Sequence, residues 1–194
     1  MTHKNVVVIA GPSGGGKNSI IDEIVSRYPL CTRLVTATTR SPRQGEQHGV
    51  DYHFLSESDF LAAHSAGDIP EHRFVEKLNT HYGTYLPDIR RKIDAGKIVV
   101  AHLDIIGARY LKKHFNATTI FIHPDSFEVL EKRVRARNPG ISDFEVQTRM
   151  DIARTEIDEH SPEYDYQVIN ANGKLSRAVE EVVAILQKEG YTLT

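Results

Sequence analysis

The chain is poor in cysteine, in long apolar runs and in excess charge of either sign. Cys31 is the single cysteine among 194 residues, which excludes a disulfide framework and a thiolate metal site and favours a small buried hydrophobe at that position. No apolar stretch approaches the roughly 20 residues of a membrane span. A formal net charge of -2 and a pI of about 6.5 give no overall field that would favour nucleic acid or an anionic membrane as a partner.

The beginning of the chain shows no secretory signal. Residues 5–10 form a short apolar segment without the charged head and longer apolar core that such a signal needs. We therefore expect a cytoplasmic protein with no membrane partner. Apolar residues make up 40% of the chain, enough for the core of one ordinary domain that carries small inserted subdomains.

Buried strands and amphipathic helices alternate along most of the chain. Apolar and β-branched runs predict strands over residues 5–10, 33–39, 50–55, 97–104, 117–123 and 166–170. Helical spacing and capping residues predict helices from Gly16, over residues 56–66, 86–96, 125–137 and 142–160, and from Leu175 to just before Gly190. This alternation favours a three-layer α/β fold around a parallel sheet with right-handed crossovers.

Two stretches interrupt this rhythm. Residues 36 to 90 contain short strands, several turns and many polar residues, which predicts a subdomain inserted into the core. Residues 137–142 contain both Pro and Gly between two predicted helices, which suits a mobile tip. The second of these helices opens with Ser142 and Glu145 in the spacing of a capping box.

Residues 11–19 read GPSGGGKNS and match the phosphate-loop pattern G-x-x-x-x-G-K-[ST] at Gly11, Gly16 and Lys17. A buried strand precedes the motif and a helix follows it, as phosphate binding requires. Glycines let backbone N–H groups curl around phosphate oxygens, and the lysine brings a full charge to the β- and γ-phosphates. We expect ATP to bind at Gly11, Pro12, Ser13, Gly14, Gly15, Gly16, Lys17, Asn18 and Ser19.

Asn18 departs from the pattern, in which a Ser or Thr hydroxyl ligates magnesium. The asparagine amide oxygen is also a hard ligand, but it lies one bond further out. Ser19 cannot take its place, because neighbouring helix residues point about 100° apart. The loop should therefore still bind phosphate, while Asn18 contacts magnesium differently, either directly or through a water molecule.

A second charged segment, TTRSPRQGEQHGVDYHF, covers residues 38–54. Arg40 and Arg43 flank a turn in it, and Tyr52 follows a short loop further on. Arginine forks match phosphate oxygens bidentately, and a phenol adds a donor, so the segment is a candidate site for a second phosphate. Taken alone, it could equally be a charged surface turn.

Five segments together resemble the guanylate kinase family of nucleoside monophosphate kinases. They are GPSGGGK, TTRSPRQGEQHGVDYHF, HYGT (81–84), LDIIGA (103–108) and VIN (168–170), and the resemblance spans about residues 5–188. The 38–54 segment is highly specific to this family, whereas the phosphate loop alone is not.

The resemblance implies a P-loop kinase core made of residues 1–35, 91–136 and 151–194. It also implies an inserted nucleoside-monophosphate-binding domain over 36–90 and a small lid at about 137–150. The implied reaction is transfer of the γ-phosphate of ATP, with Mg²⁺, to GMP or dGMP in purine nucleotide metabolism. ATP and GMP would then be the partners, and both a monomer and a homo-oligomer are compatible with the sequence.

The resemblance also assigns residues to each substrate. The GMP phosphate would be held by Arg40, Arg43, Tyr52 and Tyr82, and guanine would be contacted by Thr36, Glu71, Thr84 and Asp104. The ATP phosphates would be surrounded by Arg133, Arg137 and Arg149, with Asn170 near adenine. The transferring phosphoryl group would be stabilised by Lys17, Arg40, Arg137 and Arg149.

Four features depart from the family pattern. Asn18 and Asn138 replace the usual hydroxyl residue and glycine. His102 stands where the first acidic residue of a D-x-D pair is expected, and it can be a neutral core histidine, a residue acting through another group or a direct metal ligand. The segment between Glu71 and Tyr82 is about two residues longer than usual, which makes Glu76 a rival for the guanine contact.

Two other functions remain possible on the sequence. One is a ribose 1,5-bisphosphate phosphokinase-like enzyme, since such kinases tolerate a non-hydroxyl residue after the loop lysine. The other is a guanylate-kinase-like binding module without catalysis. The complete 38–54 segment argues against the first, and the intact Lys17 argues against the second.

Overall fold

A five-stranded parallel sheet forms the centre of the chain in the computed structural model, which describes residues 4–194 and, within them, every side chain except that of Lys77. Its strands lie in the order β2 (Cys31–Arg33), β7 (Ile98–Ala101), β1 (Val6–Ala10), β8 (Thr118–Pro124) and β9 (Tyr166–Asn170). All neighbouring strands pair in parallel. β1 and β7 are buried along their whole length, as their continuous apolar runs predict.

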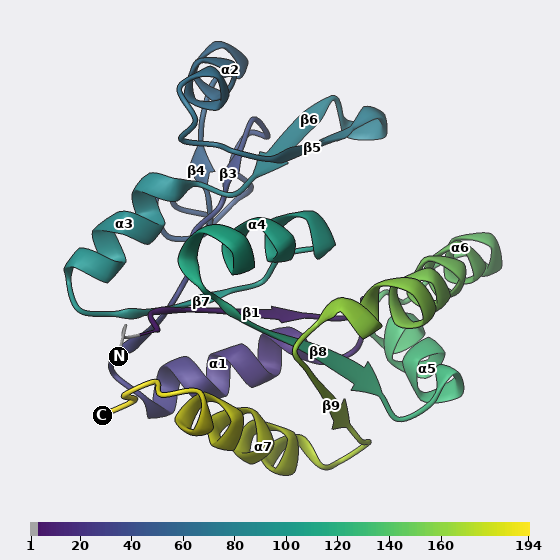
Figure 1. Cartoon of the computed structure of the whole chain (residues 1–194). Coiled ribbons are helices and arrows are strands. Elements are labelled where there is room, and N and C mark those ends of the chain that lie inside the picture. The colour runs from purple at the N-terminus through teal and green to yellow at the C-terminus, as the bar shows by residue number, and fades with distance from the viewer. Residues whose placement is uncertain (1–3) are drawn as a thin grey trace.

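Helices cover both faces of this sheet (Figure 1). α1 (Lys17–Arg27) and α7 (Leu175–Lys188) pack on one face, and α3 (Leu86–Asp94) and α4 (Ile105–Phe115) pack on the other. The α/β fold class expected from the sequence is confirmed, although the patterns above do not predict α4. None of the described helices combines the length and apolarity that crossing a bilayer demands.

A second, four-stranded sheet lies beyond α3 and α4 (Figure 1). Its strands lie in the order β4 (His53–Phe54), β3 (Ala37–Thr38), β6 (Thr80–Gly83) and β5 (His72–Val75). α2 (Glu57–Ser65) is capped by Ser56 and packs on this sheet through the fully buried Phe60. We call this second sheet the small sheet.

The prediction of one strand over residues 33–39 is wrong. β2 ends at Arg33 in the central sheet, and β3 begins at Ala37 in the small one. The reason is a buried side chain between the sheets: the N–H of Val35 donates to the carboxylate of Asp88 at 2.9 Å. A tertiary contact thus takes a backbone group that would otherwise continue the strand.

The helices α5 (Phe127–Arg137) and α6 (Asp143–Thr155) form a hairpin that projects from the core (Figure 1). They share a small apolar cluster of their own, and the predicted capping box of Ser142 and Glu145 is confirmed. The prediction of one helix over 142–160 is wrong at its end. α6 stops at Thr155 and continues as a π-helical turn, η2 (Glu156–His160), and a short 3₁₀ turn, η3 (Ser161–Glu163). Pro162, which cannot continue an α-helix, is the middle residue of η3.

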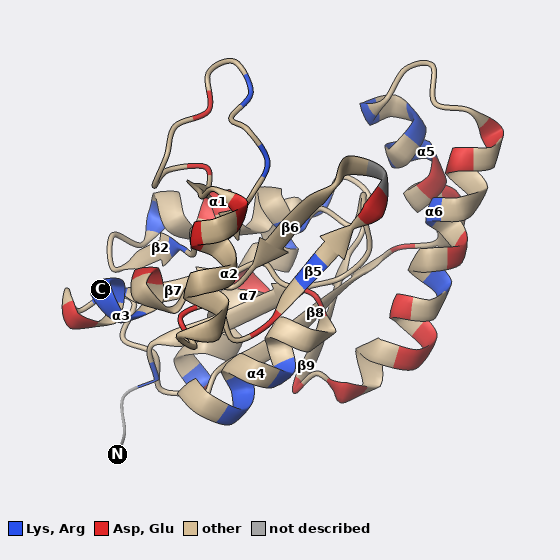
Figure 2. Cartoon of the chain, turned by 90° about the horizontal axis from the view of Figure 1, so that it is seen from above, with Lys and Arg blue, Asp and Glu red and all other residues tan. Residues whose placement is uncertain are grey.

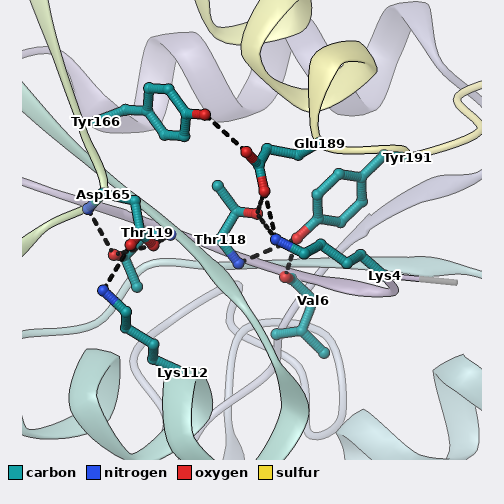
Figure 3. Close-up of polar contacts among 9 residues, drawn as sticks. All are labelled: Lys4, Val6, Lys112, Thr118, Thr119, Asp165, Tyr166, Glu189 and Tyr191. Atoms are coloured by element: carbon teal, nitrogen blue, oxygen red, sulfur yellow. Dashed lines mark hydrogen bonds and ion pairs between the residues drawn. The ribbon is translucent and has the colours of Figure 1, made fainter. Parts of the chain in front are cut away.

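Polar contacts join the two ends of the described chain to the central sheet (Figure 3). The hydroxyl of Tyr191 donates to the carbonyl of Val6 and accepts the N–H of Thr118 at 3.1 Å. Glu189 pairs with Lys4 and accepts the Tyr166 hydroxyl at 2.6 Å. These contacts bridge β1, β8, β9 and the residues after α7, so they hold the sheet at the end opposite the phosphate loop.

Asp88 is the buried charge that connects the two sheets. Its carboxylate accepts the Val35 N–H and pairs with Lys92, which also donates to the carbonyl of Arg33. The imidazole of His53, on β4, lies 3.6 Å away. Burial alone would raise the pKa of Asp88, but His53, Lys92 and the Val35 N–H outweigh it and hold the pKa far below its ordinary value.

Replacing Asp88 by Asn should lower the free energy of unfolding at pH 7 by about 3 kcal/mol, because Lys92 would stay buried without its partner. The pKa of Asp88 is lowered on folding, so its contribution is present above the unfolded pKa of about 3.9 and is lost as pH falls below it. Urea denaturation of both proteins between pH 2 and pH 8 measures this. The assignment would be contradicted if the two proteins had the same free energy of unfolding at pH 7, or if the difference between them grew as the pH was lowered.

Candidate active site

The turn between β1 and α1 has a shape that only glycine permits at two positions. Gly11 has a φ of +136°, and a Cβ there would lie 2.3 Å from the carbonyl oxygen of Ile122. Gly16 has a φ of +89°, and a Cβ there would lie 2.1 Å from the amide nitrogen of Asn170. The loop is therefore pressed against the ends of β8 and β9, and α1 begins directly after it.

Lys17 is held back over this loop. Its ammonium donates to the carbonyl of Gly11 and, at 2.8 Å, to that of Pro12. Burial lowers the pKa of Lys17 to about 8, with Glu156 opposing and Arg137 adding to the shift. The charge is thus positioned where a phosphate would exchange with the two carbonyls.

Asn170 supports the loop from the end of β9. Its side chain is buried, and its amide donates to the carbonyl of Gly15 at 2.9 Å. Arg133, from α5, reaches the Asn170 carbonyl at 3.3 Å. The family resemblance implies a place near adenine for Asn170, and in the structure its amide group contacts the phosphate loop itself.

A cleft of about 690 Å³ opens over the phosphate loop. It brings together most of the predicted ATP side chains, including Arg133 and Arg137 of α5. Figure 2 shows where Lys and Arg lie along the α5 ribbon, in blue. Pro12 and Gly15 lie buried in the loop, and Arg149 lies half-buried on α6. The residues that line the cleft are Gly11, Ser13, Gly14, Gly16, Lys17, Asn18, Ser19, His102, Leu103, Asp104, Arg133, Arg137, Glu156, Asn170, Ala171, Gly173 and Leu175.

Asn18 and His102, the two unusual residues, both line this cleft. His102 keeps an exposed surface in the cleft, but the surrounding cleft walls remove part of its solvent and lower its pKa, and the cations of Lys17 and Arg33 lower it further, so the imidazole is neutral at pH 7. Arg33 also donates to the carbonyl of Asn18 at 3.1 Å and pairs with Asp22 at 2.6 Å. His102 thus lines the cleft and does not belong to the apolar core. Arg33 lies beside Asn18 and His102, although no sequence motif indicates it.

The small sheet presents two chemically different faces. In register across its strands, Thr38 lies opposite Tyr82, and Tyr82 lies opposite Arg73. Side chains alternate along a strand, so the neighbouring residues His81 and His72 point the other way, where both rings contact Phe60 of α2. One face therefore packs on α2, and the other carries the residues expected to bind GMP.

Arg40 is the centre of the second predicted phosphate site. Its guanidinium lies 5.5 Å from the ring centre of Tyr52 and 5.6 Å from that of Phe54. Glu46 accepts from both of its terminal nitrogens at 2.9 Å and also accepts the backbone N–H of Arg43 at 2.7 Å. The rings of Tyr52 and Tyr82 are in edge contact at 5.9 Å. The structure thus gathers the predicted phosphate ligands and adds Glu46, which the sequence reasoning did not single out.

Glu71 lies on the face of the small sheet that carries Tyr82, two residues before Arg73. Its carboxylate accepts the hydroxyl and the backbone N–H of Thr84, and a Cβ on Gly107 would lie 3.2 Å from it. Burial raises the pKa of Glu71, the Thr84 hydroxyl opposes this, and the charge of Asp104 adds to it. Glu76 is exposed in the 3₁₀ turn η1 (Glu76–Leu78) at the tip of the β5–β6 hairpin. Of the two rivals, Glu71 is the one beside the other predicted guanine residues.

Asp104 and Thr36 complete this half of the site. Asp104 caps α4 through one carboxylate oxygen, which accepts the N–H groups of Ile106 and Gly107 at 3.0 and 3.2 Å, and it lines the cleft. Thr36 lies between β2 and β3, where its carbonyl accepts the N–H of His53. Among residues 4–194 no group of three or more His, Cys, Asp or Glu side chains is arranged to hold a metal ion by itself.

Comparison with known proteins gives a consistent picture. The family model described as guanylate kinase matches residues 3–189. A guanylate kinase of Rhodopirellula baltica is 36% identical over 190 residues, which cover 96% of this chain and 89% of that protein. One of Chlamydia trachomatis is 40% identical over 164 residues, which cover 84% of this chain and 78% of that protein.

Solved structures agree. The crystal structure of guanylate kinase from Anaplasma phagocytophilum has a TM-score of 0.70 and 25% identity, with 99% of this chain and 89% of that one covered. The SH3-kinase fragment of tight junction protein 3 has a TM-score of 0.57 at 13% identity, a likeness of fold alone. Together with the phosphate loop and the residues around Arg40, these matches show that the chain belongs to the guanylate kinase family.

Proposed function

We propose that the protein transfers the γ-phosphate of ATP to GMP, and less well to dGMP, giving GDP in the cytoplasm as part of purine nucleotide metabolism. The observation that carries this proposal is the pair of phosphate-binding arrangements on two different sheets. One is the glycine loop with Lys17, and the other is Arg40 with its tyrosines, next to the Glu71–Thr84 pair.

The residue roles follow the two halves of the site. Lys17 and the loop from Gly11 to Ser19 hold the ATP phosphates, with Arg133 and Arg137 from α5 and Arg149 from α6. Arg40, Arg43, Tyr52 and Tyr82 hold the GMP phosphate. Thr36, Glu71, Thr84 and Asp104 read guanine, and Asn170 keeps the loop in shape.

The chemistry needs alignment and positive charge more than proton transfer. The acceptor phosphate has a second pKa of about 6, so it is largely a dianion at neutral pH and needs no general base. Lys17, Arg40, Arg137 and Arg149 would neutralise the charge that spreads over the transferring group. These cations act locally, which explains how a chain of net charge -2 binds two polyanions.

Base selection would depend on a partly buried carboxylate. Guanine offers its N1–H and 2-amino group as donors, and Glu71 supplies acceptor oxygens beside Asp104. Adenine has no N1–H, so it would leave an acceptor unpaired in the site, which is costly.

Magnesium would accompany ATP. The cleft is lined by hard oxygen donors that suit this ion, the amide of Asn18 and the carboxylates of Asp104 and Glu156. When bound, the ion neutralises charge on the phosphates during transfer. A neutral His102 is a poor magnesium ligand, so Asn18 and Asp104 are the residues that would hold the ion or its waters.

The two projecting parts of the fold would move during the reaction. Residues 36–90, which include the small sheet, would act as the GMP-binding domain, and residues 137–150 of the α5–α6 hairpin as the lid. The rest of the chain would be the fixed core. Closure would exclude water and prevent wasteful hydrolysis of ATP.

A coupled assay with ATP tests the reaction directly. GMP should be phosphorylated and dGMP less well, whereas catalytic efficiency with AMP should be on the order of 10⁴-fold lower, as expected when a base cannot satisfy the site. Comparable turnover of AMP would refute the base assignment. Turnover of ribose 1,5-bisphosphate, or no ATP binding by calorimetry, would instead support one of the two other functions.

Glu71→Gln should raise the KM for GMP by about 10- to 100-fold, since hydrogen bonds to a charged acceptor contribute roughly 1.5–3 kcal/mol. The KM for ATP should change little, because Glu71 lies on the small sheet. Glu76→Gln at the hairpin tip is the matched control and should leave both values unchanged. Loss of GMP use in the Glu76 variant alone would overturn the assignment.

Asn18→Ser should lower the magnesium concentration for half-maximal rate, and His102→Asp should lower it further, by about tenfold in the double variant. A shorter oxygen ligand and a second carboxylate would each favour the ion. The measurement is rate against free magnesium at fixed ATP and GMP for the wild type and the three variants. If the four curves superimpose, neither residue acts on the metal.

A further inference from the structure

A second cavity, of about 430 Å³, adjoins the nucleotide cleft on the side of the small sheet. The two share Gly11, Leu103, Asp104 and Glu156 in their walls. The walls of the second cavity include Ala10 and Phe121 of the central sheet and three further parts of the fold. These three are Arg73 of the small sheet, the start of α4, and the end of α6 with η2. Arg73 and Glu156 have no role in the residue assignments above that follow from the family resemblance.

Arg73 belongs to the face of the small sheet that carries the predicted GMP ligands. It lies directly opposite Tyr82 in register and two residues from Glu71, so strand alternation places its side chain on the face of both. It is exposed, and from this face it lines the second cavity. Arg73 is therefore a positive charge on the small sheet, the part of the site that would move during closure.

Glu156 faces Arg73 from the other side. It is the first residue of the π-helical turn that ends α6, a type of turn that is frequent at functional sites. Burial raises the pKa of its carboxyl, while Lys17, His160 and Arg73 oppose this and Asp104 adds to it. The charge of Glu156 is therefore influenced by two cations, Lys17 of the core and Arg73 of the small sheet.

These two opposite charges are not yet in contact. None of the ion pairs found within the described part of the chain joins Arg73 to Glu156. The cavity separates them, and its other walls include the apolar Ile106 and Ile152, both about half exposed. Movement of the small sheet toward the core would shrink this cavity, bury the apolar side chains and bring the two charges together.

We propose that Arg73 and Glu156 form an ion pair that holds the small sheet against the core when both nucleotides are bound. The proposal rests on the proposed function, because GMP and ATP supply the reason to close. Both are positioning residues: Arg73 sets the place of the GMP-binding face, and Glu156 receives it. Pairing with Arg73 would also direct the Glu156 charge away from Lys17, leaving that ammonium to the ATP phosphates.

A double-mutant cycle tests the pair. Arg73→Ala and Glu156→Gln should each raise the KM for GMP two- to fivefold, the range that partly exposed ion pairs support. In the Glu156→Gln background, Arg73→Ala should have almost no further effect, while Arg73→Lys in the wild-type background should keep most of the affinity. Arg27→Ala, an exposed arginine paired within α1, is the matched control and should change nothing.

A distance measurement gives a readout that does not depend on turnover. Fluorescent labels at Ser65→Cys on α2 and Gln187→Cys on α7 would report the approach of the small sheet, since both positions are exposed. Cys31 is buried, and burial raises its pKa to about 11, so it should not be labelled. With GMP and a non-hydrolysable ATP analogue, the labels should approach in the wild type and stay further apart in either variant.

The outcomes separate the two proposals. Equal effects of Arg73→Ala in both backgrounds, with unchanged label distances, would overturn the ion pair while GMP phosphorylation by the wild type still stands. A wild type that does not phosphorylate GMP would refute the proposed function. In that case the label distances with both nucleotides present, compared between the wild type and the two variants, still decide whether the pair forms.

Discussion

The buried carboxylate of Asp88 is the contact on which the arrangement of the two sheets depends. It accepts the backbone N–H of Val35 and pairs with Lys92, which in turn holds the carbonyl of Arg33. These bonds fix the chain where it leaves the central sheet for the small one. The position of every residue from Thr36 to Arg40, and with it the acceptor half of the site, follows from that crossing.

The two halves of the site are built differently, although each would have to stabilise the negative charge of a phosphate. The phosphate loop uses backbone geometry, since Gly11 and Gly16 adopt conformations and approaches that a side chain would prevent. The acceptor half uses side chains, with the Arg40 guanidinium over the rings of Tyr52 and Phe54 and paired to Glu46. In both halves the cation already has an oxygen partner, so nucleotide binding at these residues would exchange one set of oxygens for another and leave no bare charge.

Local sequence patterns predict the elements whose hydrogen bonds are local or whose strands are wholly buried. The strand β9, the helix α7 and the capping box at Ser142 are of this kind, and so is the phosphate loop. The prediction of a single strand over 33–39 fails because the carboxylate of Asp88, more than fifty residues away, accepts the Val35 N–H. The break after Thr155 depends on Pro162 and on a wide turn that apolar spacing does not reveal.

The same distinction applies to the site. Family motifs bring forward Arg40 and Glu71, but Arg33, Arg73 and Glu156 gain their neighbours only when distant elements meet. Glu46 is an exception. It lies inside the quoted 38–54 segment, six residues from Arg40, and its short spacing from two arginines could have suggested the ion pair.

The β5–β6 hairpin has a consequence for how such a site tolerates changes in chain length. The turn at its tip consists of Glu76–Leu78 and a left-handed Asn79, and the strand pairs behind it remain in register. Added residues there only lengthen an outer turn. One residue added within β6 would instead reverse the parity of the strand, so that His81 would face the nucleotide and Tyr82 would face α2. The tip is thus free to vary in length, whereas the few residues behind it must keep their count.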